Sequence, residues 1–324
     1  MTPRQALPPL SLRISVTNRC SLRCTYCMPA NGVPIAAPED VLSYGEILRF
    51  VCEIKARYGL AQVRLTGGEP LVRPKIDKLV TMLAAAGISD ITLTTNGQQL
   101  VELAGGLKQA GLSRINISLD TLHAATFSAV TRGGILDKTL AGIAAAQHAG
   151  LYPIKLNMVV MRGRNDHEVA DLVRYAMKHD CQMRFLELMP IGVAAAAFED
   201  RFVSTAEVRE RLLEEFALTA IPVDPHDTSR NFLADDGHGG SAIIGFISPY
   251  SEPFCAGCWR LRLTATGVLI GCLARSEGIA LAPLLRGGAD TDGEELVEAV
   301  DQALGMKRRD GEFVQPRAMV GIGG

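Results

Sequence analysis

Apolar and polar positions along the first two thirds of the chain repeat in two alternating patterns. Short apolar runs rich in Ile, Leu and Val are each followed by a longer segment in which apolar residues recur at helical spacing. Strands that alternate with helices predict a parallel α/β architecture, because parallel neighbours need a crossover connection between them. Six such units can be counted between residues 12 and 217.

The repeating unit has the length found in (β/α) barrels, and six units would leave such a barrel open on one side. Asp166 and Ser204 are expected N-caps, and Gly87, Gly111 and Gly150 stand where helices should end. The fold class predicted is therefore an α/β, partial (β/α) barrel. Its expected strands are 12–16, 62–66, 91–95, 114–119, 154–160 and 183–188, and its expected helices are 44–58, 74–86, 98–109, pieces up to 148, 166–179 and 204–216.

The alternation is lost after about residue 216. Residues 219–240 are rich in Pro, Asp, His and Gly, and this composition predicts an irregular connection. Strand-like pieces at 242–248 and 260–265 follow, and 294–304 has a helical pattern. We therefore expect a barrel over 1–217 and a smaller C-terminal region over 218–324.

The amino-acid composition and charge of the chain argue against some classes of function. The chain has 324 residues, 48% of them hydrophobic, and a formal net charge of −2, which suits a packed core and argues against a general nucleic-acid or anionic-membrane surface. Residues 1–10 contain prolines and lack the apolar segment of a secretory signal, and no apolar stretch is long enough to span a bilayer. These features predict a soluble, cytoplasmic protein without a nucleic-acid or membrane partner.

Three of the eight cysteines form a compact C-x3-C-x2-C group, Cys20, Cys24 and Cys27. Thiolates select zinc, copper(I) or iron–sulfur clusters, and structural zinc nearly always takes four ligands. A four-iron cluster held by three cysteines would keep one iron open for a small molecule. Zinc with a distant fourth ligand, or three unrelated buried thiols, are the alternatives.

A second group lies in the C-terminal region with C-x2-C-x13-C spacing. Arg260 and Arg262 alternate along an extended piece inside it, so both should face one side and form an anion site. Zinc is again the alternative, with Cys181 or a histidine as the fourth ligand. The three thiols of this group are Cys255, Cys258 and Cys272.

Small polar residues follow several of the expected strands, where the site of a (β/α) barrel lies. The second strand leads into Gly67-Gly68-Glu69-Pro70, whose glycines allow close approach to a ligand or simply form a tight turn. Asp120, after the fourth strand, is interpreted as a cap or turn former. Lys155, within the fifth strand, faces solvent, pairs with a carboxylate or provides a charge for phosphate.

The cysteine knot with Tyr26 before its last cysteine, together with the Gly-Gly-Glu-Pro element, resembles the radical S-adenosyl-L-methionine (SAM) enzymes. The second cysteine group, its two arginines and the terminal Gly323-Gly324 narrow this likeness. From about Leu10 to the C-terminus the chain resembles the GTP 3′,8-cyclases of molybdenum cofactor biosynthesis, the MoaA family. The alanine-rich segment 192–198 departs from the common pattern and puts only loop shape in doubt.

The resemblance implies a lyase with two 4Fe-4S clusters, one on each cysteine group, and SAM bound at the open iron of the first. A radical formed from SAM would take the 3′ hydrogen of GTP. The resulting C3′ radical would add to C8 of the same guanine, and reduction would give the 3′,8-cyclised nucleotide. Implied SAM positions are Tyr26, Gly68, Ser118 and Met189. Implied GTP positions are Arg13, Arg64, Thr95, Lys155, Arg260, Leu261 and Arg262, with Arg260, Arg262, Gly323 and Gly324 assigned to catalysis.

The implied partners are GTP as substrate, an electron donor of the flavodoxin or ferredoxin type, a downstream cyclic pyranopterin monophosphate synthase, and a second copy in a homodimer. The sequence leaves two other functions open. A radical SAM enzyme that modifies a peptide would cleave SAM without GTP and would not need Arg260 or Arg262. A zinc-stabilised binding protein without catalysis would contain zinc and no iron.

Overall fold

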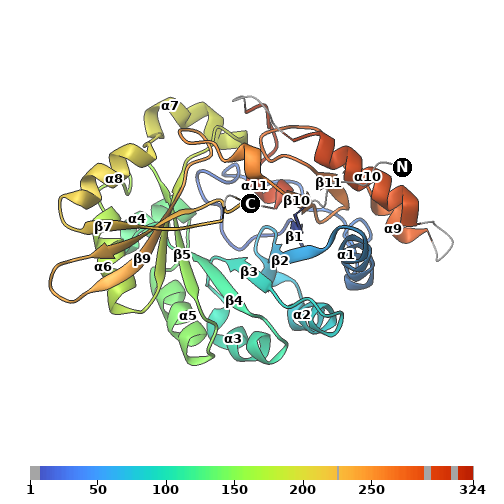
Figure 1. The fold of residues 1–324 in the computed structure, drawn as a ribbon, viewed down its shortest axis with the longest axis horizontal. Helices are drawn as coiled ribbons and strands as arrows, with labels where there is room; N and C mark the ends of the chain where they lie inside the picture. Colours follow the sequence, from blue (N-terminus) through green and yellow to red (C-terminus); the bar gives the residue numbers. More distant parts are fainter. Residues whose placement is uncertain (1–7, 225, 288–292, 308–312, 324) are drawn as a thin grey trace.

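The backbone forms one curved sheet with helices along its outer face (Figure 1). The computed structural model describes residues 8–224, 226–287, 293–307 and 313–323. Six parallel strands occupy the middle of the sheet in chain order, β1 to β6. The predicted open α/β barrel is confirmed, because the two ends of the sheet do not pair with each other in the described residues. These strands are β1 (Leu10–Ser15), β2 (Leu60–Thr66), β3 (Ile91–Thr95), β4 (Arg114–Ser118), β5 (Ile154–Val160) and β6 (Gln182–Glu187).

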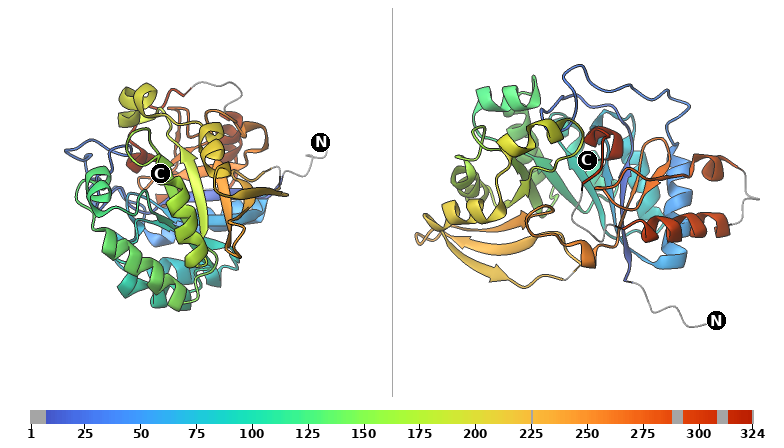
Figure 2. Two further views of the ribbon diagram at one scale, coloured as in Figure 1. Left: turned by 90° about the vertical axis from the view of Figure 1, so that its left-hand side faces the viewer. Right: turned by 90° about the horizontal axis from the view of Figure 1, so that it is seen from above.

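Strands of the C-terminal region extend this sheet at both edges. β10 pairs in parallel with β1, and β9 pairs in parallel with β6, so each adds one parallel strand to the barrel. Antiparallel strands follow outside them in the order β10-β11-β12 and β9-β8-β7. The second of these sets, coloured gold to orange, lies at one side of the molecule in the right-hand view of Figure 2. Their bounds are β7 (Ala217–Ile221), β8 (Arg230–Asp235), β9 (Ser241–Ile247), β10 (Arg260–Leu263), β11 (Val268–Ile270) and β12 (Ile279–Ala280).

The prediction of an irregular connection over 219–240 is wrong, since part of β7 and all of β8 lie there. Both strands belong to an antiparallel extension at the edge of the sheet, and most of their side chains are exposed or half-buried. Strands in such a position lack the continuous apolar run of a buried parallel strand. The composition therefore resembled that of a loop.

The helices of the barrel pack on the outer face of the sheet, where their apolar stripes meet the buried side of the strands (Figure 1). α10 packs along α1 and β11, so a helix of the C-terminal region covers the first helix of the barrel. The longer helices are α1 (Tyr44–Tyr58), α2 (Ile76–Ala85), α3 (Leu100–Gln109), α4 (Ala124–Thr131), α5 (Leu136–His148), α6 (Val169–Lys178), α8 (Thr205–Leu213) and α10 (Gly293–Gly305). Short helical pieces are η1 (Pro70–Val72), η2 (Gly192–Ala197), α7 (Phe198–Arg201), η3 (Cys255–Gly257), α9 (Ala282–Arg286) and α11 (Met319–Ile322).

Local signals at the helix ends are mostly as predicted. Ser204 caps α8 in a capping box with Glu207. The predicted cap at Asp166 is wrong: α6 starts later, after Glu168, and the Asp166 carboxylate instead accepts hydrogen bonds from Gly163 N and Arg211. The three predicted glycines each follow a helix end with positive φ. Within the described residues, no helix is both long and apolar enough to cross a membrane.

Candidate active site

Strand alternation directs a set of cationic side chains into the barrel. In β5 the apolar residues at alternate positions are buried, whereas Lys155 and Asn157 lie on the opposite, inner side. The same alternation applies to β1 and β2, where Arg13 and Arg64 are register partners. Arg13 is also the register partner of Arg262 on β10, so three guanidinium groups come from neighbouring positions on three adjacent strands. The inner surface is therefore strongly basic despite the negative net charge.

The loop with the first cysteines is fastened to the Gly-Gly-Glu-Pro turn by its backbone. Gly68 N donates to Thr17 O at 2.7 Å, and Glu69 N donates to Arg19 O at 2.8 Å. A Cβ atom at Gly67 would lie 2.5 Å from Thr17 O, and one at Gly68 would lie 2.3 Å from Arg19 O. The two glycines are thus required by close backbone packing, which places the turn directly against the cysteine loop.

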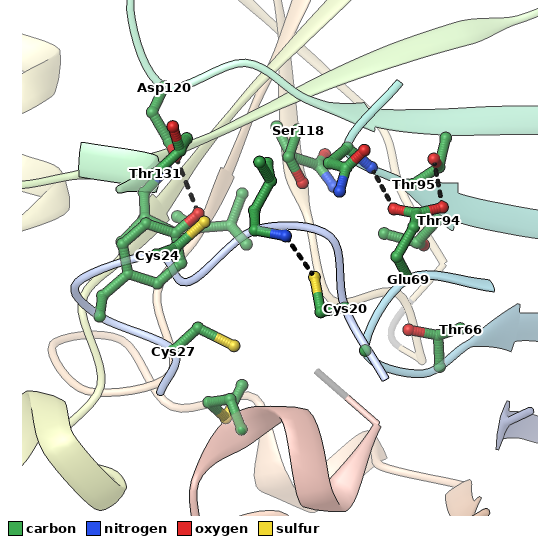
Figure 3. A pocket seen from close by; sticks show the side chains of 18 of the residues that line it. Cys20, Cys24, Cys27, Thr66, Glu69, Thr94, Thr95, Ser118, Asp120 and Thr131 are labelled. Carbon is green, nitrogen blue, oxygen red and sulfur yellow. Dashed lines mark hydrogen bonds between the residues drawn. The ribbon is translucent and has the colours of Figure 1, made fainter. Parts of the chain in front are cut away.

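The first three thiols line one cavity at the carboxyl ends of the strands (Figure 3). All four predicted SAM positions line the same cavity. Burial raises the pKa of Cys20 to about 11 and that of Cys27 to about 12, and it raises the pKa of Cys24 well above its usual value. The surrounding protein does not stabilise three thiolates by itself, so this donor set fits a positively charged metal group, which would favour their deprotonated form.

Glu69 is a buried carboxylate that connects the turn to the third strand. Its Oε1 accepts from Thr95 Oγ1 at 2.7 Å, and its Oε2 accepts from Asn96 N at 2.8 Å. Leu71 N also donates to Oε1 at 3.0 Å. Burial raises the pKa of Glu69 to about 7, even though these hydrogen bonds favour the charged form. The predicted GTP residue Thr95 thus lines the first cavity and holds this carboxylate.

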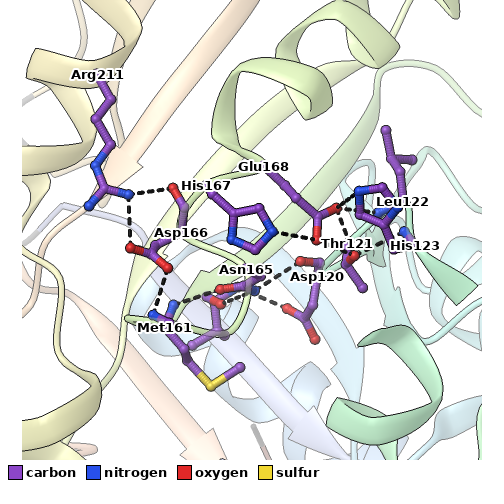
Figure 4. Close-up of polar contacts among 12 residues, drawn as sticks. Asp120, Thr121, Leu122, His123, Met161, Asn165, Asp166, His167, Glu168 and Arg211 are labelled. Atoms are coloured by element: carbon purple, nitrogen blue, oxygen red, sulfur yellow. Dashed lines mark hydrogen bonds and ion pairs between the residues drawn. The ribbon is translucent and has the colours of Figure 1, made fainter. Parts of the chain in front are cut away.

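The carboxylate of Asp120, which was predicted to form a cap or turn, accepts hydrogen bonds from two other segments of the chain. Its Oδ2 accepts from the hydroxyl of Tyr26 at 2.8 Å, and its Oδ1 accepts from Val159 N at 2.9 Å. Asn165 donates to the carbonyl oxygens of Asp120 and Val159, which ties the ends of β4 and β5 together (Figure 4). Burial raises the pKa of Asp120 to about 6. This residue therefore positions Tyr26 next to the thiols of Cys24 and Cys27.

The second three thiols line an adjoining cavity between β10 and the end of the chain. Arg260 and Arg262 line it together, as their alternation predicted, and Arg262 is buried. Burial raises the pKa of Cys258, but the cations of Lys307 and Arg260 outweigh this effect and lower it overall. The two cavities share the lining residues Arg13, Leu186, Glu187, Met189, Ile247 and Met319.

Cationic groups in and around the cavities have lowered pKa values because they are buried close to one another. Burial and the arginines at 184, 114 and 64 lower the pKa of Lys155 to about 7. Burial and Arg184 lower the pKa of Arg64 to about 9. A polyanion placed among these groups would relieve their mutual repulsion. Such an arrangement favours a phosphate-bearing ligand.

The end of the chain closes the site between the two cysteine groups. Gly323 O accepts a hydrogen bond from Arg262 Nη1 at 2.8 Å, and Met319 N donates to Cys27 O at 3.1 Å. The short helix α11 therefore contacts the first cysteine loop and an arginine of the second cavity. The predicted catalytic residue Gly324 lies outside the described residues.

Each cysteine set supplies three ligands, whereas a structural zinc ion nearly always takes four. In the part of the chain that the structure describes, no three His, Cys, Asp or Glu side chains are arranged to hold a metal ion. A zinc ion would draw its thiolates to about 2.3 Å from one point. Each set also offers three cysteines and a cavity beside them.

Two of the predicted GTP residues, Leu261 and Lys155, do not line either cavity with their side chains. Leu261 is fully buried in the hydrophobic core, so only its backbone could face a ligand. Lys155 is not among the residues that line the two cavities, although it shares the inner face of β5 with Asn157, which does line the first.

Sequence reasoning missed Arg184, which lines the first cavity from β6 and is the register partner of Asn157. A cation at an inward position of a strand is the signal that identified Lys155, and it would have identified Arg184 too. Lys307, beside Cys258, gave no comparable signal because it follows a helix far along the chain.

Comparisons with known proteins cover nearly the whole chain. The sequence profile of the Radical SAM superfamily matches residues 14–176, and that of Molybdenum Cofactor Synthesis C matches residues 181–313. The chain is 44% identical over 319 residues to the GTP 3′,8-cyclase of Moorella thermoacetica, covering 97% of each. It is 42% identical over 306 residues to the GTP 3′,8-cyclase of Listeria monocytogenes serovar 1/2a, covering 93% of this chain and 89% of the other.

Solved structures support the fold independently. Streptococcus suis SuiB bound to the precursor peptide SuiA aligns with a TM-score of 0.61 at 14% identity, covering 92% of this chain and 66% of that one. At this identity the likeness concerns the fold alone. It therefore gives no support to the peptide-modifying alternative.

Proposed function

This chain belongs to the GTP 3′,8-cyclase family of the radical SAM superfamily, and we propose that its two adjoining cavities perform that reaction. The product is (8S)-3′,8-cyclo-7,8-dihydroguanosine 5′-triphosphate, in the first step of molybdenum cofactor biosynthesis. The observation that carries the proposal is that the cavities of the two cysteine sets meet and share Arg13 and Met189. A ligand that spans both would contact each set at one end.

Membership of the radical SAM superfamily implies an iron–sulfur cluster and SAM. We assign this cluster to Cys20, Cys24 and Cys27, and SAM to the cavity beside them. When bound, the reduced cluster and SAM supply a 5′-deoxyadenosyl radical that removes hydrogen from a substrate. The protein's own part is to hold the cysteine loop against the Gly67-Gly68 turn and to fix Tyr26 through Asp120.

The second set is assigned to a second 4Fe-4S cluster, which would face the guanine of GTP. Arg260 and Arg262 line that cavity, and Arg13 connects it to the first. Guanidinium groups bind phosphate and purine edges through paired hydrogen bonds. The half-buried cations Arg64, Lys155 and Arg184 offset the triphosphate, because the arginines around them act on them more strongly than the nearby aspartates.

Ring closure depends on holding the ribose and base of one nucleotide in fixed relation. Such orientation can contribute several kcal/mol to a rate. The tail contributes by packing α11 on the Cys27 loop and by accepting a hydrogen bond from Arg262 at Gly323. Arg262 is therefore held in place by the chain's own end, and we assign Gly323 and Gly324 a role in completing the GTP site.

The test uses protein with anaerobically reconstituted clusters, reductant, SAM and GTP. Formation of 5′-deoxyadenosine together with a product of unchanged GTP mass is expected. Cys24→Ala should abolish SAM cleavage, whereas Arg260→Ala should keep cluster 1 and weaken productive GTP use. Formation of 5′-deoxyadenosine without a GTP-derived product would reopen the substrate assignment, and normal cyclisation by Cys24→Ala would refute the mechanism.

Three further features belong to the same proposal. We assign the electron supply to a carrier of the flavodoxin or ferredoxin type, and consumption of the product to cyclic pyranopterin monophosphate synthase. We also propose a homodimer. The division into 1–217 and 218–324 is retained as a division of roles, with SAM chemistry in the first part and the second cluster in the other.

A further inference from the structure

Lys307 lies beside a thiol of the second cysteine set. It follows α10, and its Nζ is 3.7 Å from Cys258 Sγ. The same ammonium donates a short hydrogen bond to the backbone oxygen of Arg260. Lys307 is half-buried, and it contacts Cys258 although it is not itself among the residues that line the two cavities. The sequence patterns that identified the site gave this residue no role.

The positive charge of Lys307 lies next to a sulfur atom that becomes negative when it holds a metal group. Cys258 contributes a thiolate when it holds a metal group, and an added electron on that group increases the local negative charge. A cation held within a few ångströms of a sulfur ligand favours the more negative, reduced form, and the effect is larger in a partly buried site than in water. Arg260 also acts on Cys258, but its guanidinium is oriented toward the Phe254 ring and His226 O.

We propose that Lys307 is a positioning residue that raises the reduction potential of the cluster held by Cys255, Cys258 and Cys272. This inference rests on the proposed function, since it requires a second cluster on these three cysteines. It adds that the reducibility of this cluster is set by one ammonium group supplied from the end of α10.

A purely structural role for Lys307 makes a different prediction. The hydrogen bond to Arg260 O would then be the important contact, and any donor of similar length would serve. Lys307→Gln keeps a donor for that carbonyl and loses the charge. Lys307→Arg keeps the charge, and Lys307→Met removes both.

The experiment is a redox titration of the full-length holoenzyme, followed by electron paramagnetic resonance. The second cluster is identified as the signal that changes when GTP is added. Lys108→Gln serves as the matched control, because Lys108 Nζ also donates to a backbone oxygen, that of Gly150, at 2.7 Å, and lines neither cavity. Iron content is measured first for every variant.

At a fixed applied potential, the ratio of reduced to oxidised second cluster should fall at least tenfold in Lys307→Gln and Lys307→Met, a shift of about 59 mV for one electron. Lys307→Arg and Lys108→Gln should stay within about threefold of the wild-type ratio, well inside the one decade that 59 mV represents. Loss of the second cluster from both uncharged variants, with retention in Lys307→Arg, would overturn the inference, because the charge would then be needed to hold the cluster and not to set its potential. A wild-type ratio in Lys307→Gln would overturn the inference alone. Wild-type protein with a single cluster would overturn it together with the proposed second cluster.

Discussion

Gly68→Ala tests how closely the Gly-Gly-Glu-Pro turn packs on the first cysteine loop. The added methyl carbon would lie 2.3 Å from Arg19 O and 2.6 Å from Arg19 C. It would also lie 3.0 Å from Cγ2 of Val320, which is buried in α11. Two of these contacts are with backbone, which cannot rotate away. The substitution must therefore move the residue that immediately precedes Cys20.

The size of the effect follows from the contact distance. Carbon and oxygen atoms approach closely at about 3.3 Å, so the two backbones must separate by about 1 Å. Overpacking of this kind destabilises a protein by about 1–3 kcal/mol. A displacement of about 1 Å in reacting groups can lower a rate by about 10²-fold. We expect a modest loss of stability and a much larger loss of SAM cleavage.

Gly106→Ala is the matched control, because a Cβ atom there meets nothing within 4 Å on the exposed side of α3. It should stabilise the helix by about 0.5–1 kcal/mol and leave activity unchanged. The assays are denaturant unfolding of both variants and the rate of 5′-deoxyadenosine formation after reconstitution to equal iron content. A wild-type rate in Gly68→Ala would refute the close packing of the turn on the loop.

Three further predictions concern buried polar groups. Tyr26→Phe leaves the Asp120 carboxyl without one of its donors and should lower the free energy of unfolding by about 1–3 kcal/mol; no change in urea unfolding would mean that the hydrogen bond is unimportant. The raised pKa of Glu69, about 7 against 4.5, means that the folded metal-free protein binds this proton more tightly than the unfolded chain. Its stability should therefore fall as pH rises from 4.5 to 7, by at most about 3 kcal/mol from this group, and Glu69→Gln should flatten the curve. The pKa of Lys155, lowered to about 7, predicts proton uptake when a triphosphate binds. The GTP dissociation constant measured by calorimetry should rise toward tenfold per unit above pH 7, and a Lys155→Met variant with the same pH dependence would contradict this.

Much of the barrel was predictable because its strands bury apolar residues under the helices and read as short runs rich in Ile, Leu and Val. The predicted run at 154–160 coincides with β5, and that at 91–95 coincides with β3. β7 and β8 were missed, since edge strands with exposed side chains follow no such pattern. The pairing of β10 with β1 was also beyond sequence patterns, because it joins segments from opposite ends of the chain.

In the candidate site, too, the features with a local sequence pattern were predicted and those that depend on contacts between distant residues were not. Both cysteine groups and the glycine turn have fixed local spacing, so the sequence identified them. Asp120 was noticed but interpreted as a turn former, because its partner Tyr26 is 94 residues away. Arg184 carries the same signal as Lys155, a cation within a strand, and was overlooked. Lys307 reaches the site because the chain after α10 returns to Cys258, and no local signal expresses such a contact.

The central claim is that SAM and GTP meet where the two adjoining cavities of the cysteine sets share their lining residues. Transfer of the substrate hydrogen tests this most directly. Reconstituted protein would be given GTP deuterated at C3′, and the 5′-deoxyadenosine formed would be analysed by mass spectrometry. The account predicts one deuterium in 5′-deoxyadenosine and its loss from the cyclised product. Unlabelled 5′-deoxyadenosine, formed at the same rate with or without GTP, would contradict it.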